Sequence, residues 1–269
     1  MQIRVKRSLV VLLVLFLALG CLNANSSKFT CSLGWDLGLM VGSVGLVGGN
    51  FVWEKSQTAV AYGGTPSTSL EDLNFLDKCA VFKYNATLDK VSTVSTIALL
   101  LAPSALAFTG LDTGSLFTYG LMYAETIALT YGLKELCKNS VARERPYLYY
   151  EGYPSEELSN GDYCRSFLSG HTALAFASAT YLTTVLSCDY KSSGFRVPVI
   201  ATSYAVATAI AATRILSGNH YLTDVLAGAL LGSICGVAVP LLHTFGNSKE
   251  GSNVSVQLTP VGLYLGVRV

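Results

Sequence analysis

Long stretches without a charged residue are the feature of this chain that most constrains its fold. A bilayer span needs about 20 mostly apolar residues, and several charge-free runs approach or exceed that length. Soluble proteins bury apolar helices, but rarely this many of such length. The pattern therefore predicts an all-α, polytopic transmembrane helical bundle of about five or six spans rather than a soluble periplasmic helical domain. The runs cover residues 8–27, 37–53, 91–111, 166–188, 197–213 and 225–248, and a further run, 115–133, is interrupted only by Glu125.

Composition removes two other classes of protein. Charged residues make up 13% of the 269 residues, compared with about 25% in average soluble domains. Intrinsic disorder requires low hydrophobicity and high net charge, whereas 51% of this chain is hydrophobic. Its 18 Lys and Arg residues are nearly balanced by 17 Asp and Glu residues, so it lacks the basic surface that nucleic acids require. We expect a membrane-bound protein without a nucleic-acid partner.

The first apolar run has the pattern of a secretory signal peptide. Three basic residues precede an apolar block, and small residues follow it, which is the order of charged region, hydrophobic region and cleavage site. We assign residues 1–24 to a signal peptide or, alternatively, to an uncleaved N-terminal helix. Cys21 stands where the cysteine of a lipoprotein would be acylated, and the sequence leaves its acylation open.

The second run decides which side of the membrane carries the later loops. Residues 37–53 contain five glycines and are barely long enough to span, so they either cross or form an interfacial or re-entrant element. If they do not cross, the loops 134–165 and 214–224 face the outside. If they cross, the same loops face the cytoplasm.

Cysteine positions favour the first alternative, because it places four of the seven cysteines on one oxidising face, where disulfides are permitted. The protein is then expected in the inner (cell) membrane with its functional face on the periplasmic or extracytoplasmic side. We accordingly divide the chain into an extramembrane or re-entrant region (25–91), a helical core (92–245) and a tail (246–269). Disulfide pairing and oligomeric state are not specified by the sequence. The four cysteines are Cys31, Cys79, Cys137 and Cys164.

Polar residues gather in three clusters at the ends of the apolar runs. An out-and-back pair of helices, 166–188 and 197–213, returns the third cluster to the membrane face of the second. A loop joins the first cluster to the second, so all three are expected at one lipid–water boundary. Three fixed cations in a partly desolvated pocket favour a polyanion, and the arginine fork fits phosphate oxygens. The clusters are Lys138 and Arg145; Ser169, Gly170 and His171; and Arg214, His220 and Asp224.

The histidines suggest a reaction on that anion. His220 and Asp224 are four residues apart, a spacing that brings side chains together on a helical turn. A carboxylate on one imidazole nitrogen leaves the other free as a nucleophile, and His171 is then the general acid for the leaving oxygen. Ser169 and Gly170, at the start of a helix, add backbone N–H donors aimed at the anion. Each residue alone has an ordinary explanation as a cap or membrane anchor, so the argument depends on their coincidence.

The three clusters together resemble the signature of the type 2 phosphatidic acid phosphatase (PAP2) superfamily, in its membrane-bound lipid phosphatase branch. Lys138 is followed by six residues and Arg145-Pro146, then Ser169-Gly170-His171, and last Arg214, five residues, His220, three residues and Asp224. The likeness covers residues 138–228. Leu168 stands where the family usually has Pro, and Thr213 where it usually has Ser. Leu168 is expected to loosen the turn, and Thr213 keeps a hydroxyl.

The resemblance implies a site without metal or other cofactor. His220 would form a phosphohistidine, Asp224 would orient it and His171 would act as the acid. The remaining residues would hold the substrate phosphate: Lys138, Arg145, Ser169, Gly170 and Arg214.

We therefore expect a metal-independent phosphatase that hydrolyses a phosphate monoester or pyrophosphate on a membrane lipid, of the phosphatidate, phosphatidylglycerol phosphate, undecaprenyl pyrophosphate or lipid A type. Two alternatives stay open at this stage. One is a periplasmic acid phosphatase acting on small phosphate esters. The other is a non-enzymatic membrane protein that binds lipid phosphate without turnover.

Overall fold

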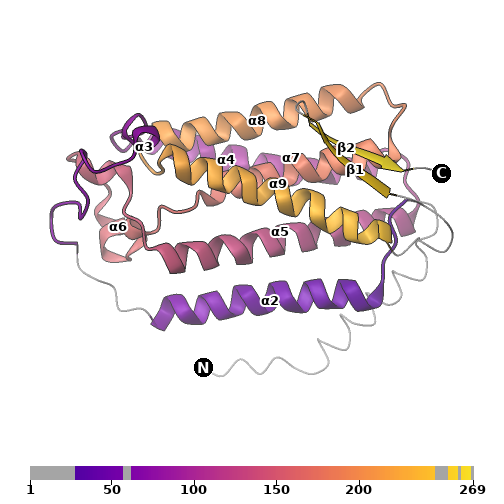
Figure 1. The fold of residues 1–269 in the computed structure, drawn as a ribbon, viewed down its shortest axis with the longest axis horizontal. Helices are drawn as coiled ribbons and strands as arrows, with labels where there is room; N and C mark the ends of the chain where they lie inside the picture. The colour runs from indigo at the N-terminus through magenta and orange to yellow at the C-terminus, as the bar shows by residue number, and fades with distance from the viewer. Residues whose placement is uncertain (1–27, 57–61, 246–253, 260–261, 268–269) are drawn as a thin grey trace.

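In the part of the chain that the structure describes, six long helices form a bundle, and their axes run roughly along one direction (Figure 1). The computed structural model describes residues 28–56, 62–245, 254–259 and 262–267. The expected signal peptide and Cys21 lie outside these ranges. The long helices are α2 (Leu33–Ser56), α4 (Ala86–Leu101), α5 (Thr113–Val141), α7 (Gly170–Asp189), α8 (Arg196–Leu216) and α9 (Leu222–Phe245).

Short elements lie between the long helices or after them, with α3 and α6 at one end of the bundle and β1 and β2 toward the other (Figure 1). A 3-10 helix, η1, continues α4 after Pro103 interrupts its α-helical hydrogen bonding. The tail, which the sequence indicated as a strand or an irregular end, forms an antiparallel hairpin of β1 and β2. These elements are α3 (Phe75–Lys78), η1 (Ala102–Phe108), η2 (Pro146–Tyr149), α6 (Ser155–Ser159), η3 (Asp162–Cys164), β1 (Val254–Thr259) and β2 (Gly262–Val267).

Asparagine and aspartate caps fix where two of the helices begin. The Asn85 side chain accepts hydrogen bonds from two backbone N–H groups in the first turn of α4, and Asp112 does the same for α5. Such caps satisfy N–H groups that have no partner within the helix. At its other end, α5 stops at Ala142, which adopts the left-handed conformation. The caps thus fix the residue at which each helix begins.

The surface of α2 is inverted relative to that of a soluble protein. Trp35, Val44 and Val52 are each more than 60% exposed, whereas Asp36 and Ser43 are buried. Apolar side chains outside and polar side chains inside are favourable only when the surrounding solvent is lipid. This arrangement supports a helix that faces the hydrocarbon of a membrane.

The predicted class, an all-α polytopic bundle, is confirmed. Four helices of the described part, α2, α4 with η1, α8 and α9, are individually long and apolar enough to span a membrane. The other two long helices, α5 and α7, are more polar. Because α7 packs against α4, α5, α8 and α9, most of its surface faces protein rather than lipid and needs no apolar outer face.

The run 37–53 forms part of one continuous 24-residue helix, α2, which is long and apolar enough to cross a membrane. Cys31 Sγ lies 3.5 Å from Thr118 Oγ1, near the start of α5, whereas Cys137 lies near its end. Nineteen residues of helix separate these two positions by about 28 Å. Cys31 and Cys137 therefore lie at opposite ends of the bundle, and the grouping of four cysteines on one face was wrong.

Three glycines of α9 allow its backbone to approach α7 closely. A Cβ on Gly232 would lie 2.0 Å from the carbonyl oxygen of Ala173, and one on Gly236 would lie 2.8 Å from that of Ala177. Gly228 similarly faces Ser169. Small residues every fourth position are the usual means of close helix packing in membranes, where van der Waals contact replaces the hydrophobic effect as the driving force. This contact fixes α9 against the helix that begins with the second polar cluster.

We predict that Gly232→Ala destabilises the protein by about 1–3 kcal/mol, as expected for overpacking, because the new methyl group meets backbone that cannot rotate away. Gly120→Ala on α5 is the matched control, since nothing lies within 4 Å of its added Cβ. It should be neutral or stabilising by up to about 1 kcal/mol. Thermal unfolding in detergent measures both variants, and equal midpoints would contradict the close α7–α9 contact.

Candidate active site

The three polar clusters meet at one end of the bundle, as their order along the chain predicted. The Ser169 backbone N–H donates to the Asp224 carbonyl over 3.0 Å, which joins the start of α7 to the start of α9. Arg145 Nη1 donates to Asn219 Oδ1 over 2.9 Å, which joins the segment after α5 to the loop between α8 and α9. Residues far apart in sequence are thereby held close together at this end of the bundle.

The imidazole of His220 is buried and its orientation is fixed by backbone. Nδ1 lies 2.7 Å from the carbonyl oxygen of Ser166, and because a carbonyl only accepts, Nδ1 must carry the proton. Nε2 is then the nitrogen with a lone pair. A nucleophilic histidine needs one ring nitrogen fixed by a hydrogen bond and the other unprotonated. His220 has this arrangement.

The expected direct contact between Asp224 and His220 is not a hydrogen bond. Asp224 Oδ2 lies 3.8 Å from His220 Nδ1, because His220 precedes the first residue of α9 and the two side chains do not share a helical face. Asp224 accepts instead from Ser166 Oγ at 2.6 Å and from the Tyr221 backbone N–H at 2.9 Å. The carboxylate therefore positions His220 through Ser166, whose carbonyl holds the imidazole.

Sequence reasoning missed Arg143, which binds two carboxylates at once. Its Nη1 lies 2.5 Å from Asp224 Oδ1, its Nη2 lies 2.6 Å from Asp77 Oδ2, and its guanidinium stacks on the Tyr221 ring at 4.1 Å. Asp77, in α3, also accepts from the backbone N–H of Thr223 at 3.0 Å. Arg143 thus fastens α3 and the first turn of α9 together. In the sequence, only its position two residues before Arg145 could have pointed to a role in the site.

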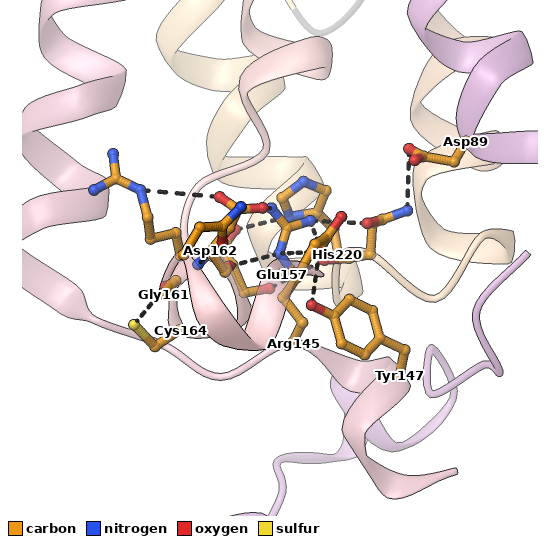
Figure 2. A network of polar contacts seen from close by, with 12 residues as sticks. Asp89, Arg145, Tyr147, Glu157, Gly161, Asp162, Cys164 and His220 are labelled. Carbon is orange, nitrogen blue, oxygen red and sulfur yellow. Dashed lines mark hydrogen bonds and ion pairs between the residues drawn. The ribbon is translucent and has the colours of Figure 1, made fainter. Parts of the chain in front are cut away.

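Carboxylates that the sequence did not single out pair with the predicted phosphate-binding arginines. Arg145 is bonded to the Asp162 side chain and lies 3.9 Å from Glu157. Arg214 is bonded to Asp89, at the start of α4. Figure 2 shows Asp162 and Glu157 around Arg145, with His220 close beside this group. The arginines are therefore held in place before any anion arrives.

One donor of this group is left over. Arg214 is only 3% exposed, its Nη1 donates to Ser92 Oγ at 2.9 Å as well as to Asp89, and its Nε has no hydrogen-bond partner among the described residues. A buried donor without a partner carries a desolvation penalty of about 1–3 kcal/mol. A bound anion is the kind of ligand that would relieve it.

The second cluster lies where predicted, with one change in its hydrogen bonds. Ser169 is the N-cap of α7, but its backbone N–H is donated to Asp224 and is not aimed at the pocket. A Cβ on Gly170 would lie 2.9 Å from Cδ of the flexible Lys134 side chain, which lies against the start of α7. His171 Nε2 lies 3.2 Å from Thr93 Oγ1 of α4, in the partly exposed part of the site.

Charge around His220 keeps it neutral. Burial, followed by the positive charges of Arg214, Arg145 and Lys138, lowers its pKa well below the ordinary value of 6.5. Burial opposes ionisation of Asp162, but the charges of Arg145 and Lys138 outweigh it and lower the pKa of that carboxyl. The site therefore combines an ionised Asp162 carboxylate with an unprotonated imidazole nitrogen.

The two departures from the family pattern have local explanations. Leu168 is only 3% exposed and packs inside the protein, and Ser169 after it still occupies the N-cap position of α7, with no capping hydrogen bond from its side chain. The hydroxyl of Thr213 donates to the Ile210 carbonyl at 2.8 Å, a bond within α8. In this structure neither residue enters the polar network described above.

A comparison with models of known families gives one match. Residues 119–247 match the model of the PAP2 superfamily, and this segment contains all three clusters. This segment is similar to the PAP2 superfamily, as the three clusters predicted. The match supports the expected class, a PAP2-type phosphoric ester hydrolase. The PAP2 match begins within α5 and ends just after α9, so α2 and α4 lie outside it.

Two solved structures are similar to this chain. One is the first transmembrane PAP2-type phosphatidylglycerolphosphate phosphatase from Bacillus subtilis, with 19% identity, coverage of 78% of this chain and 100% of the other, and a TM-score of 0.48. The second is Aquifex aeolicus LpxE, with 25% identity, coverage of 64% of this chain and 98% of the other, and a TM-score of 0.42. No curated protein matches the chain.

We predict that inorganic phosphate raises the unfolding temperature of the protein in detergent and that Arg214→Gln removes this effect. At tenfold excess over Kd, binding should contribute about 1.4 kcal/mol. The variant lacks the buried donor and leaves Asp89 without its partner, so the pocket repels anions. Arg196→Gln, at the opposite end of α8, is the control and should respond as the wild type does. A phosphate response retained by Arg214→Gln would place the anion elsewhere.

Proposed function

We propose that the protein hydrolyses a phosphate monoester or pyrophosphate on a membrane lipid, through a phosphohistidine on His220. The observation that carries the proposal is the buried imidazole whose Nδ1 is bonded to a carbonyl and whose surroundings include Lys138, Arg145 and Arg214. A neutral nitrogen nucleophile beside three cations suits attack on a phosphorus that carries negative oxygens.

The reaction would proceed in two steps. His220 Nε2 attacks phosphorus, the bond from phosphorus to the ester or anhydride oxygen breaks, and His171 gives its proton to that leaving oxygen. In the second step His171 takes a proton from water, the water oxygen attacks phosphorus, and the bond to Nε2 breaks to release phosphate. Lys138, Arg145 and Arg214 would bind the three other oxygens throughout, with Gly170 leaving room at the start of α7. Ser169 would shape that turn as its N-cap.

A lipid substrate is favoured over a small ester by the surroundings of His171. Thr93, its hydrogen-bond partner, belongs to α4, and apolar residues on that helix, Val91, Val94 and Ile97, are about half exposed or more. Because α4 is apolar enough to span the membrane, an acyl or prenyl chain can lie along it while its phosphate enters the pocket. A small soluble ester would gain nothing from this apolar surface.

The side of the membrane that carries the site depends on α2. We inferred an extracytoplasmic site on the condition that residues 37–53 do not cross, and α2 has the length to cross. With an exported N-terminus, a crossing α2 places the site on the cytoplasmic face. Cys79, which is exposed near α3, reports the side. Labelling by an impermeant maleimide in intact cells indicates the outside, and labelling only after permeabilisation indicates the cytoplasm.

We expect the detergent-purified protein to release phosphate in EDTA from at least one lipid in a panel of phospholipid, polyprenyl and lipid A phosphates, faster than from p-nitrophenyl phosphate. His220→Ala should reduce this rate by at least about 10²-fold, because no other group replaces the nucleophile. Acid-labile phosphate on the denatured wild-type protein would report the phosphohistidine. Release only from the small ester would favour the acid phosphatase, and binding without release would favour the non-enzymatic alternative.

The midpoint of the acid limb in the pH profile of kcat/KM should lie below pH 6.5. Burial and the three neighbouring cations lower the pKa of His220, so its nucleophilic, unprotonated form persists as the pH drops below the value at which an ordinary histidine titrates. A pH–rate profile at subsaturating lipid measures this limb. A midpoint at or above pH 6.5 would show that the essential base is not a histidine in this environment.

A further inference from the structure

Three ionisable side chains meet inside the bundle, away from the active site. Asp36 of α2, Glu125 of α5 and His243 of α9 are 1%, 0% and 3% exposed. His243 Nε2 lies 3.1 Å from Asp36 Oδ1 and 3.3 Å from Glu125 Oε2. Thirteen residues of α5 separate Glu125 from Lys138, about 20 Å along the helix. The cluster is therefore too distant to take part in phosphate chemistry.

The orientation of His243 directs a basic nitrogen toward the two carboxylates. Its Nδ1 lies 2.9 Å from the carbonyl oxygen of Val239, so Nδ1 must donate and Nε2 is the nitrogen that faces the acids. A histidine whose second nitrogen is bonded to a backbone carbonyl has the arrangement typical of metal-ligating histidines, because that bond fixes the tautomer and the ring.

Two buried carboxylates around one imidazole require a positive charge among them. Ionisable groups inside a membrane bundle are costly unless they are paired or bind an ion, and each of these three lies on a helix whose outer surface is apolar. Glu125 Oε1 has no hydrogen-bond partner within the described ranges, although the side chain is fully buried. Oε2 of this carboxylate faces His243, and Oε1 is still available as a ligand.

The two distances from His243 are compatible with a small tetrahedral ion. One nitrogen or oxygen atom from each of the three residues can be chosen so that all lie within 4.8 Å of one another. Tetrahedral Zn²⁺ with bonds of about 2.0–2.1 Å to nitrogen and oxygen separates its ligand atoms by about 3.3 Å, close to the 3.1 and 3.3 Å measured from His243. Two carboxylates and a neutral imidazole also balance the charge of a divalent cation.

We propose that Asp36, Glu125 and His243 form a structural binding site for a divalent cation, with Zn²⁺ as the ion that the spacing fits. The ion joins three helices whose ligands are far apart in sequence. Two of them, α5 and α9, belong to the segment that matches the PAP2 superfamily, whereas α2 lies outside it. The site thus fastens an additional helix to the catalytic core.

The test is the zinc content and thermal stability of the full chain, purified without a polyhistidine tag. We expect about one zinc ion per chain after exposure to Zn²⁺ and removal of excess. A strong chelator should lower the unfolding temperature, and Zn²⁺ should restore it. Both measurements use the wild-type protein and do not depend on a variant that folds. Substoichiometric zinc together with no response to the chelator would overturn the proposal and assign the positive charge to a protonated His243.

Variants then locate the site. His243→Gln and Glu125→Gln should bind far less zinc and lose the response to the chelator. His171→Gln, which removes a histidine from the opposite end of the bundle, is the matched control and should keep both. Zinc retained by the first two variants, or lost by the control, would contradict the assignment of these ligands.

Discussion

The Asp224 carboxylate is the interaction on which the geometry of the active site depends. It accepts from Ser166, from the Tyr221 backbone and from Arg143, and each of these bonds fixes a different part of the pocket. Ser166 carries the carbonyl that orients His220, and Arg143 reaches α3. Because the site is buried, replacing any of these bonds with water is costly. One side chain therefore holds the loop before α7, the loop before α9 and the segment after α5 together.

The membrane environment explains why so much of this network is internal. Polar groups on helices that face lipid cannot be hydrated, so they turn inward and bind one another. On α2 this produces a buried polar stripe beneath an apolar outer surface. The hydrogen bond of 2.9 Å from Asn50 Nδ2 to the Gly132 carbonyl of α5 belongs to it. The same constraint concentrates charged residues at the end of the bundle, where the PAP2 motifs lie.

The helical class and the meeting of the three motifs could be predicted because both follow from local patterns. Apolar runs of span length specify helices, and out-and-back connectivity returns their ends to one face. The contact between Asp224 and Ser166 could not be predicted, because a spacing of four residues suggests a direct bond to His220. Whether His220 lies inside or before α9 depends on where that helix begins. The cluster of Asp36, Glu125 and His243 could not be predicted either, because its members are distant in sequence and share no motif.

The ion pairs of Arg145 with Asp162 and of Arg214 with Asp89 have a consequence for turnover. A pocket of bare cations would retain inorganic phosphate and be inhibited by its own product. Here each arginine has a carboxylate beside it that can take up its charge again when the anion departs. The pairs thus lower the affinity for a free anion while keeping the guanidinium groups in place. If the proposed reaction takes place here, such a site exchanges phosphate readily and needs no rearrangement before the next substrate.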